Sequence, residues 1–392
     1  MNKLGFGFMR LPLLDGLERT SIDYSTLSKM VDYFINNGFS YFDTGYAYHN
    51  GESEKALKKV VVDRYDRKQF QIADKMPLFM IRNKEQMSSI FNEQLRRCGV
   101  TFFDYYLLHA VGNANYPMIK EIEAFKFLKH KQSMGNIRHI GISYHDKADL
   151  LEEILLNHPE IEVVQLQINY VDWDDPVIES RKCYEVAEKY GKKIIVMEPV
   201  KGGVLANVPS EVEEIFKQYD VNSTPASWAL RYVASKPQVM LILSGMSSFA
   251  QMNENVATIK NFKTMNEEED AILESAKALI LKSIEIPCTS CHYCTKNCPK
   301  GINIPEYFAI YNNLKKFQIS QKLVASIYFN NLQKKSARIS ECIGCKECES
   351  VCPQHIEITS KLKEVYYELS RQSILSTRKI YKSNLLQNKK QQ

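Results

Sequence analysis

The residues with the clearest chemical meaning are cysteines near the end of the chain. The sequence of 392 residues contains ten cysteines, and eight of them form two short runs. Both runs have the spacing C-x2-C-x2-C-x3-C followed by proline; they are Cys288, Cys291, Cys294 and Cys298, then Cys342, Cys345, Cys348 and Cys352. Thiolates at this spacing are typical ligands of iron–sulfur clusters. Structural zinc usually takes paired C-x2-C knuckles from separated places, so the spacing favours iron–sulfur clusters over two zinc sites.

Both cysteine runs resemble those of bacterial ferredoxins with two 4Fe–4S clusters. In that pattern the first three thiolates of a run wrap one cube, and the fourth turns away to the other cube. The resemblance implies one cluster on Cys288, Cys291, Cys294 and Cys352, and another on Cys342, Cys345, Cys348 and Cys298. The long gap between the runs contains two segments with helical patterns, 304–317 and 321–335. This organisation resembles the α-helical ferredoxin type.

A second set of reactive side chains lies in the first third of the chain. An aspartate, a lysine and a histidine each stand at the end of a short apolar run, and a tyrosine follows the aspartate by five residues; they are Asp43, Lys75, His109 and Tyr48. We call these four residues the tetrad. If the apolar runs are strands of an eightfold barrel, polar residues at their carboxyl ends are the usual catalytic ones.

The pattern of the first 280 or so residues predicts such a barrel. Short apolar runs alternate with amphipathic segments from about residue 30 to 245. This alternation predicts an α/β fold with a parallel sheet, whose buried strands read as continuous apolar runs. About eight such units fit a (β/α)8 TIM barrel, which typically needs about 250 residues. The segment 4–14, followed by a turn at Asp15-Gly16, is expected to cap the barrel bottom as a hairpin.

The first 260 or so residues resemble the aldo/keto reductase family. The family places an aspartate, a tyrosine five residues later, and a lysine and a histidine at the ends of following strands, which matches the tetrad in order and spacing. An acidic residue continues the loop, here Glu52 or Glu54. Further matches follow in order at Gly141-Ile142-Ser143, Gln165 and Glu254-Asn255.

The resemblance implies the interconversion of a small carbonyl compound and an alcohol. Carbonyl reduction needs a proton on oxygen, and Tyr48 is the implied acid and base. Lys75, held by Asp43, would favour the phenolate of Tyr48 and lower its pKa. His109 would donate a hydrogen bond to the substrate oxygen. Because none of these side chains carries reducing equivalents, the implied hydride donor is a nicotinamide nucleotide.

The implied nucleotide site departs from the family pattern in several places. Ser143 and Gln165 match residues that bind the nicotinamide carboxamide, but Tyr144 replaces the usual asparagine and Met197 replaces an aromatic ring. The stretch that carries a Lys-Ser pair and an arginine in NADP-specific members has no such cations; its candidate binding residues are Gly245, Ser247, Gln251, Glu254 and Asn255. Weaker support for a 2′-phosphate makes NADH as eligible as NADPH. Lys201 or Lys260 could supply the missing charge.

The implied barrel reaction and the implied clusters transfer different numbers of electrons at a time. A hydride carries two electrons, whereas each iron–sulfur cluster transfers one at a time. A flavin in the barrel could divide the pair, or the clusters could exchange electrons with a redox partner protein, a ferredoxin or a flavoprotein. The clusters could also be structural or regulatory. The alternative function is an electron-transfer iron–sulfur protein whose barrel is a docking module or binds a flavin rather than a nicotinamide.

Composition and charge exclude other classes of protein. The net charge of +5 is small for this length and does not favour nucleic acid or a membrane as partner. No apolar run approaches the roughly 20 residues that span a bilayer, and the first residues do not resemble a signal peptide. We therefore expect a cytoplasmic protein. The expected domains are the barrel (1–283), the two-cluster domain (284–360), and a helical then polar tail (361–392).

Overall fold

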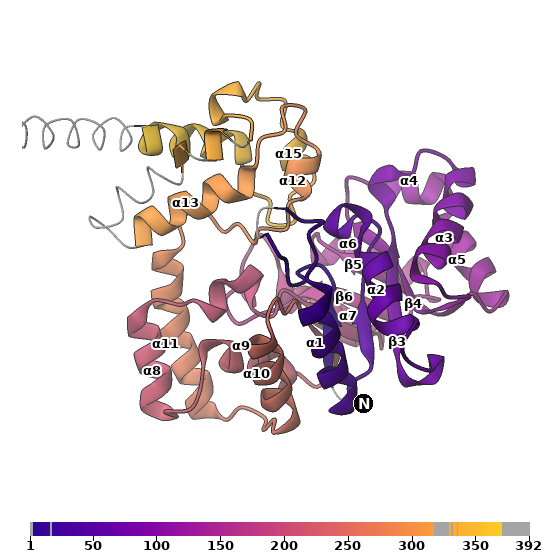
Figure 1. Cartoon of the computed structure of the whole chain (residues 1–392), viewed down its shortest axis with the longest axis horizontal. Coiled ribbons are helices and arrows are strands. Elements are labelled where there is room, and N and C mark those ends of the chain that lie inside the picture. Colours follow the sequence, from indigo (N-terminus) through magenta and orange to yellow (C-terminus); the bar gives the residue numbers. More distant parts are fainter. Residues whose placement is uncertain (1–2, 16–17, 317–328, 331, 335, 371–392) are drawn as a thin grey trace, which may run out of the picture. The chain divides into compact units, whose positions relative to one another are not determined.

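The computed structural model describes residues 3–15, 18–316, 329–330, 332–334 and 336–370 (Figure 1). These residues form two compact units. The first consists of Met1–Lys201, Leu205–Asn207 and Glu213–Glu274, and the second of Gly202–Val204, Val208–Val212 and the chain from Ser275 onward. No helix in these described ranges is long and apolar enough to cross a membrane.

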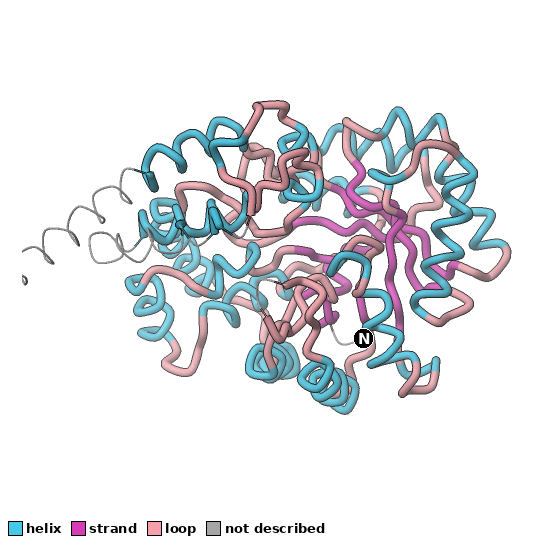
Figure 2. The backbone as a smooth tube through the Cα atoms, turned by 45° about the horizontal axis from the view of Figure 1, so that its top comes forward, coloured by secondary structure: helices cyan, strands magenta, loops and turns pink. Residues whose placement is uncertain are grey.

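The first unit is a closed barrel of parallel strands with helices around it, which confirms the predicted (β/α)8 fold (Figure 2). Each strand pairs with its neighbour in the sequence, and the last pairs with the first. The strands are β1 (Leu4–Gly7), β2 (Tyr41–Asp43), β3 (Gln71–Met76), β4 (Phe103–Val111), β5 (Ile137–Tyr144), β6 (Val163–Gln167), β7 (Lys193–Met197) and β8 (Val239–Ser244).

The first strand corrects the expected hairpin at the barrel bottom. Leu4–Gly7 is a barrel strand, with Gly5 opposite Tyr41 of β2 and opposite Leu243 of β8. Without it, the facing edges of β2 and β8 would leave their backbone groups unpaired, which is costly in a buried sheet. The antiparallel bridge found in this region joins Leu13 to Ile22, after the strand has ended.

The helices follow the amphipathic segments of the sequence. Local capping fixes several ends: Asp23 and Asn83 accept backbone N–H groups at the starts of α1 and α3, and Gly99 ends α3 in the left-handed conformation. The helices are α1 (Tyr24–Asn36), α2 (Ser53–Leu57), α3 (Lys84–Cys98), α4 (Tyr116–Glu121), α5 (Ala124–Ser133), α6 (Ala148–Asn157), α7 (Ser180–Lys189), α8 (Ser210–Tyr219), α9 (Pro225–Ala234), α10 (Phe249–Lys260) and α11 (Glu267–Ser283).

The second unit packs short helices around the cysteine runs. They are α12 (Tyr293–Lys296), α13 (Ile304–Lys316) and α15 (Glu347–Ser350), and residues 358–370 are also helical. Ile302, Tyr307, Phe308 and Val365 are among its fully buried core residues, and Cys294 and Cys348 belong to the same core. The expected helix 304–317 is thus found, whereas most of 321–335 and the tail 371–392 lie outside the described residues.

The barrel interior leaves no room for a side chain at Gly141 of β5. A Cβ there would lie 2.4 Å from Cγ2 and 2.8 Å from the carbonyl oxygen of Val163 on β6. We expect Gly141→Ala to lower the free energy of unfolding by about 1–3 kcal/mol, because the strands must move apart. Denaturant unfolding followed by circular dichroism measures this. The control is Gly135→Asn, at a left-handed turn with no atom near the added Cβ; equal losses in the two variants would contradict the packing argument.

Candidate active site

The tetrad converges at the rim formed by the carboxyl ends of the strands. Asp43 ends β2, Lys75 lies near the end of β3 and His109 near the end of β4. Tyr48 opens a short 3-10 turn (Tyr48–Gly51) that follows β2. All four side chains are buried, with Tyr48 the most exposed at 7%. The barrel therefore brings together four polar side chains from three successive strand ends.

The ammonium group of Lys75 lies at the centre of the tetrad. Its Nζ donates to Oδ1 of Asp43 at 2.5 Å and to the carbonyl oxygen of Thr44 at 2.7 Å. The same Nζ lies 5.0 Å from the centre of the Tyr48 ring. Burial raises the pKa of Asp43, and the ammonium group opposes that shift. A buried cation at this place stabilises the phenolate form of Tyr48 over the phenol.

His109 lies beside the Tyr48 phenol. The two ring centres are 5.9 Å apart and the ring planes are nearly perpendicular, at 81°. The ring of Phe79, in the loop after β3, lies 6.2 Å from the His109 ring and is 39% exposed. A substrate oxygen that reaches Tyr48 can therefore also meet the imidazole, with an exposed aromatic ring alongside.

Two neighbours in the sequence fix the position of Tyr48. A Cβ on Gly45 would lie only 3.1 Å from the phenol ring, so glycine leaves the space that the ring needs. His49 has a φ of 50°, and its Nε2 accepts the N–H of Leu11 at 3.1 Å. Its Nδ1 therefore carries the proton and donates to the carbonyl oxygen of Arg19 at 2.7 Å. The loop after β1 is thereby tied to the residue next to Tyr48.

Two of the predicted nucleotide-binding residues lie next to the tetrad. Ser143 on β5 stands opposite Gln165 on β6 in the strand register. The Gln165 Nε2 donates to Oδ2 of Asp43 at 3.4 Å, and the Ser143 Oγ lies 3.4 Å from Nε2 of His145. An amide and a hydroxyl at adjacent strand ends suit the hydrogen-bonding groups of a carboxamide.

The other predicted nucleotide-binding residues gather after β8 and on α10; they are Gly245, Ser247, Gln251, Glu254 and Asn255. Asn255 donates to the hydroxyl of Ser244 at 3.0 Å, and the Ser247 N–H donates to the Gln251 side chain at 2.7 Å. Glu254 instead accepts a hydrogen bond from Thr224, the N-cap of α9. The structure thus brings four of the five to the end of β8 and turns Glu254 toward α9.

The cation at this place is Arg10, which sequence reasoning missed. Its side-chain stem lies on Gly245, where an added Cβ would come within 3.1 Å of the Arg10 Cβ. Its carbonyl oxygen accepts from the Ser247 hydroxyl at 3.1 Å, and its guanidinium lies 3.4 Å from the Glu198 carboxylate. The closure of the barrel could have predicted the position of Arg10, because the loop after β1 must lie beside the loop after β8.

Both lysines considered as substitutes are bound by other side chains. Lys201 is buried and pairs with Asp172 at 2.5 Å, and Asp172 also accepts from Gln167 at 2.8 Å. Lys260 donates to the Asn37 side chain at 3.1 Å on the barrel surface. The ion pair of Lys201 thus connects the segment after β7 to the loop after β6. The Lys201 charge is therefore not directed at a phosphate.

Cysteines of the two runs affect one another's pKa in the second unit. Burial raises the pKa of the Cys294 thiol, and the charges of Cys291, Cys288 and Cys352 raise it further. Burial likewise raises the pKa of Cys348, to about 11, with contributions from Glu349, Cys298 and Cys342. Each of these two buried cysteines is therefore affected by the fourth cysteine of the other run, Cys352 for Cys294 and Cys298 for Cys348. Soft thiolate donors in fours fit iron–sulfur cubes.

Comparison with known proteins identifies both parts of the chain. Residues 3–278 match the model of the aldo/keto reductase family. The chain belongs to the aldo/keto reductase family. Residues 287–357 match the model of a 4Fe-4S dicluster domain. The protein is thus an oxidoreductase of the aldo/keto reductase family with a C-terminal iron–sulfur domain.

Individual relatives of this aldo/keto reductase are distant. The uncharacterized oxidoreductase YqkF of Bacillus subtilis (strain 168) is 23% identical in an alignment 278 residues long, which covers 63% of this chain and 86% of YqkF. The aldo-keto reductase AKR11C1 from Bacillus halodurans, in its holo form, is 22% identical with a TM-score of 0.56, over 70% of this chain and 91% of that one. An aldo-keto reductase from Klebsiella pneumoniae in complex with NADPH is 18% identical with a TM-score of 0.56, over 70% and 90%. These likenesses show a common fold.

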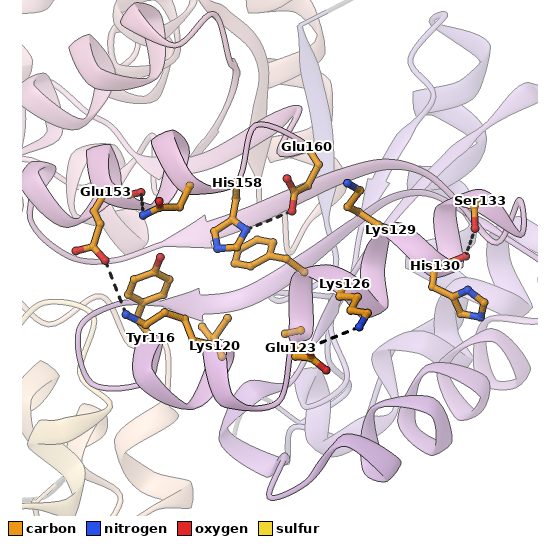
Figure 3. Close-up of a pocket in the computed structure, with 14 residues that line it drawn as sticks. Tyr116, Lys120, Glu123, Lys126, Lys129, His130, Ser133, Glu153, His158 and Glu160 are labelled. Carbon is orange, nitrogen blue, oxygen red and sulfur yellow. Dashed lines mark hydrogen bonds and ion pairs between the residues drawn. The ribbon is translucent and has the colours of Figure 1, made fainter.

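One cavity of this aldo/keto reductase lies away from the tetrad. It has a volume of about 800 Å³ and is lined by α4, α5, α6 and the segment after α6 (Figure 3). Some of its charged groups pair with one another: Lys120 with Glu153, and Lys126 with Glu123. The His158 Nδ1 lies 3.2 Å from the Glu160 carboxylate, and the His158 ring stacks on Phe125. No tetrad residue lines it, so we assign it no part in the reaction.

The proposed pairing of the cysteines predicts which cluster each one serves. We expect Cys352→Ser to perturb the same cluster as Cys291→Ser, and Cys298→Ser to perturb the other, because a hard hydroxyl replaces a soft thiolate. Iron content and electron paramagnetic resonance of the reduced protein distinguish the two spectra. Cys183→Ser, at a buried thiol that contacts the carbonyl oxygen of Asp146, is the control and should leave both unchanged. Matching spectra for Cys352→Ser and Cys298→Ser would refute the pairing.

Proposed function

We propose that the barrel interconverts a small carbonyl compound and an alcohol, with Tyr48 as the general acid and base. The observation that carries this proposal is the buried Lys75 ammonium, held between Asp43 and the Tyr48 ring with His109 beside the phenol. A reduced nicotinamide, when bound, supplies the hydride that adds to the carbonyl carbon.

In the direction of reduction, side chains of the tetrad act on the carbonyl oxygen of the substrate. The imidazole of His109 donates a hydrogen bond to the carbonyl oxygen and stabilises the negative charge that develops on it. The phenol of Tyr48 gives its proton to that oxygen as the C–H bond forms, and Lys75 stabilises the phenolate that remains. In the direction of oxidation the phenolate takes the proton back. Burial of all four groups keeps water away from the charges.

The residues around the rim fit a nicotinamide nucleotide. Gln165 and Ser143 offer an amide and a hydroxyl next to Asp43, where the carboxamide would lie. Arg10 offers a guanidinium over Gly245 for a phosphate, although Glu198 competes for it. The solved relative from Klebsiella pneumoniae, which contains NADPH, supports the choice of nucleotide class.

The two sets of cysteines fit two 4Fe–4S clusters, which when bound exchange electrons singly. Because the barrel chemistry moves electrons in pairs, we propose that the clusters pass electrons to or from a redox partner protein, a ferredoxin or a flavoprotein. The support is the pair of four-cysteine runs in the sequence and the match of residues 287–357 to a dicluster domain.

The role of Tyr48 is tested by Tyr48→Phe. We expect this variant to lose about 10²- to 10⁴-fold in kcat for carbonyl reduction, because the ring stays and only the proton donor is removed. Tyr46→Phe is the matched control: its hydroxyl donates to Glu93 at 2.9 Å, outside the tetrad, so its kcat should stay near that of the parent protein. Steady-state kinetics on a set of small aldehydes and ketones measures both. Undiminished reduction by Tyr48→Phe would remove the proposed mechanism.

The role of Arg10 is tested by Arg10→Met. Loss of a charged hydrogen bond costs about 1.5–3 kcal/mol, so we expect roughly 10- to 100-fold weaker nucleotide binding in calorimetry. Equal weakening for NADH and NADPH places Arg10 at the pyrophosphate, and weakening for NADPH alone places it at the 2′-phosphate. Lys260→Met is the control and should bind as the parent protein does. If the parent protein, with intact clusters, binds neither nucleotide, the result supports the alternative function. In that case the protein transfers electrons, and its barrel docks a partner or binds a flavin.

A further inference from the structure

A buried polar network lies behind the tetrad, on the outer side of β3 and β4. Successive side chains of a strand point to opposite faces, so Asp74 faces outward where Lys75 faces the rim. There it meets side chains from α2, α3 and β4; the network consists of Glu54, Asp74, Gln94, Arg97, Cys98 and Tyr106. Glu54, Asp74, Gln94 and Tyr106 have no exposed surface at all.

Two carboxyl groups of this network share one hydrogen bond. The side chains of Glu54 and Asp74 are bonded to each other, and a bond between two carboxyl groups requires a proton on one of them. Glu54 also accepts from Arg97 at 3.1 Å and from Gln94 at 3.1 Å. Burial raises the pKa of Glu54, but these donors act in the opposite direction and favour its carboxylate, which leaves the proton on Asp74. Burial and the charge of Glu54 raise the pKa of Asp74 well above its usual range.

The other groups that face the pair are consistent with a single negative charge. Arg97 on α3 is the cation that contacts Glu54, while the Lys75 ammonium is committed to Asp43 at the rim. Burial raises the pKa of Cys98 on α3 and of Tyr106 on β4 well above their usual values, so both stay neutral. The buried carboxylate of Glu54 then lies against the Arg97 guanidinium, which also pairs with the partly exposed Glu93 at 2.7 Å.

The network also holds the backbone of Lys75 on both sides. The Lys75 N–H donates to Oδ1 of Asp74 at 2.8 Å. The Lys75 carbonyl oxygen accepts from Nε2 of Gln94 at 3.0 Å. The Tyr106 hydroxyl donates to the Gln94 side-chain oxygen at 2.5 Å and fixes the orientation of that amide. Two polar side chains thus set the place from which the Lys75 stem reaches Asp43.

We propose that Glu54 and Asp74 share a single proton, and that this pair and Gln94 are positioning residues that hold Lys75 in line with Tyr48. The inference rests on the proposed function for what Lys75 does, but the shared proton stands independently of it. A second ionised carboxylate in the network would repel the carboxylate of Glu54 and break the bond between the two side chains.

The shared proton has its own spectroscopic test. In the full-length protein at neutral pH, infrared spectroscopy should show the C=O stretching band of a protonated carboxyl group, shifted in heavy water. We expect Asp74→Asn to remove that band. Asp104→Asn is the matched control, because Asp104 is also buried on the barrel wall but is held by Arg67 at 2.5 Å and Arg138 at 2.9 Å. A parent protein without the band, or a band that survives in Asp74→Asn, overturns the shared proton.

The positioning role is tested by kinetics. We expect Asp74→Leu to lower kcat for carbonyl reduction roughly 10- to 100-fold with little change in KM, because a misplaced Lys75 affects the reacting geometry more than binding. Asp74→Asn retains an acceptor for the Lys75 N–H and a donor for Glu54, so it should restore most of kcat. If Asp74→Leu does not fold, Gln94→Met removes the donor to the Lys75 carbonyl and should lower kcat while the infrared band remains. Unchanged kcat in Asp74→Leu or Gln94→Met, or a loss in Asp74→Asn as large as in Asp74→Leu, overturns the positioning role.

The pH dependence of stability gives a second readout that needs no substrate. The unfolded Asp74 ionises above about pH 4, whereas the folded one keeps its proton, so its contribution to the free energy of unfolding falls as pH rises toward the folded pKa. Asp74→Asn removes this contribution. Its stability relative to the parent protein should therefore improve between pH 4 and neutrality, and a difference that is constant over this range overturns the raised pKa. Failure of Tyr48→Phe to affect reduction would remove the proposed function without touching this result.

Discussion

The structure around the rim depends on one buried ion pair, that of Lys75 and Asp43. Removing both charges from water costs several kcal/mol per ion, and their attraction offsets this only when the remaining donors and acceptors are satisfied. The barrel meets that condition with the carbonyl oxygen of Thr44 on one side and the amide of Gln165 on the other. The ammonium group can then act on Tyr48 through a medium with little water, where a charge has a longer reach than in solution.

The closure of the sheet determines what else the rim can hold. Because β1 pairs with β8, the two ends of the barrel sequence meet, and the loop after β1 crosses beside the loop after β8. His49 and Ser247 both bind the peptide group between Arg10 and Leu11, His49 through the Leu11 N–H and Ser247 through the Arg10 carbonyl oxygen. A single segment thus joins the residue next to Tyr48 to the proposed phosphate site. In the iron–sulfur unit, by contrast, the spacing of the cysteines along the chain largely determines where the thiols lie.

The sequence predicted most of what depends on local pattern. Strand and helix periodicity predicted the barrel, and the spacing of polar residues predicted a tetrad that the structure brings together. The prediction failed where a long-range contact decides the outcome. Half of Leu4–Gly7 is glycine, so it does not read as an apolar run, and only the need of β2 and β8 for a partner makes it a strand. Arg10 and Phe79 stand in loops whose destinations depend on closure and packing. Lys201 carries the right charge for a phosphate, but it forms an ion pair with Asp172, which is distant in the sequence. The carboxyl pair of Glu54 and Asp74 was equally hidden, because its partners come from three separate elements.

The two cysteines outside the clusters have a practical consequence. Cys98 and Cys183 are both buried, and burial raises the pKa of each thiol, that of Cys183 to about 12. Since the thiolate is the form that reacts with alkylating reagents, neither should be modified while the barrel is folded. A maleimide or iodoacetamide probe added to the native protein would therefore count only cluster ligands that have lost their iron. Mass spectrometry of the labelled chain can then follow, cysteine by cysteine, how oxygen dismantles the metal centres.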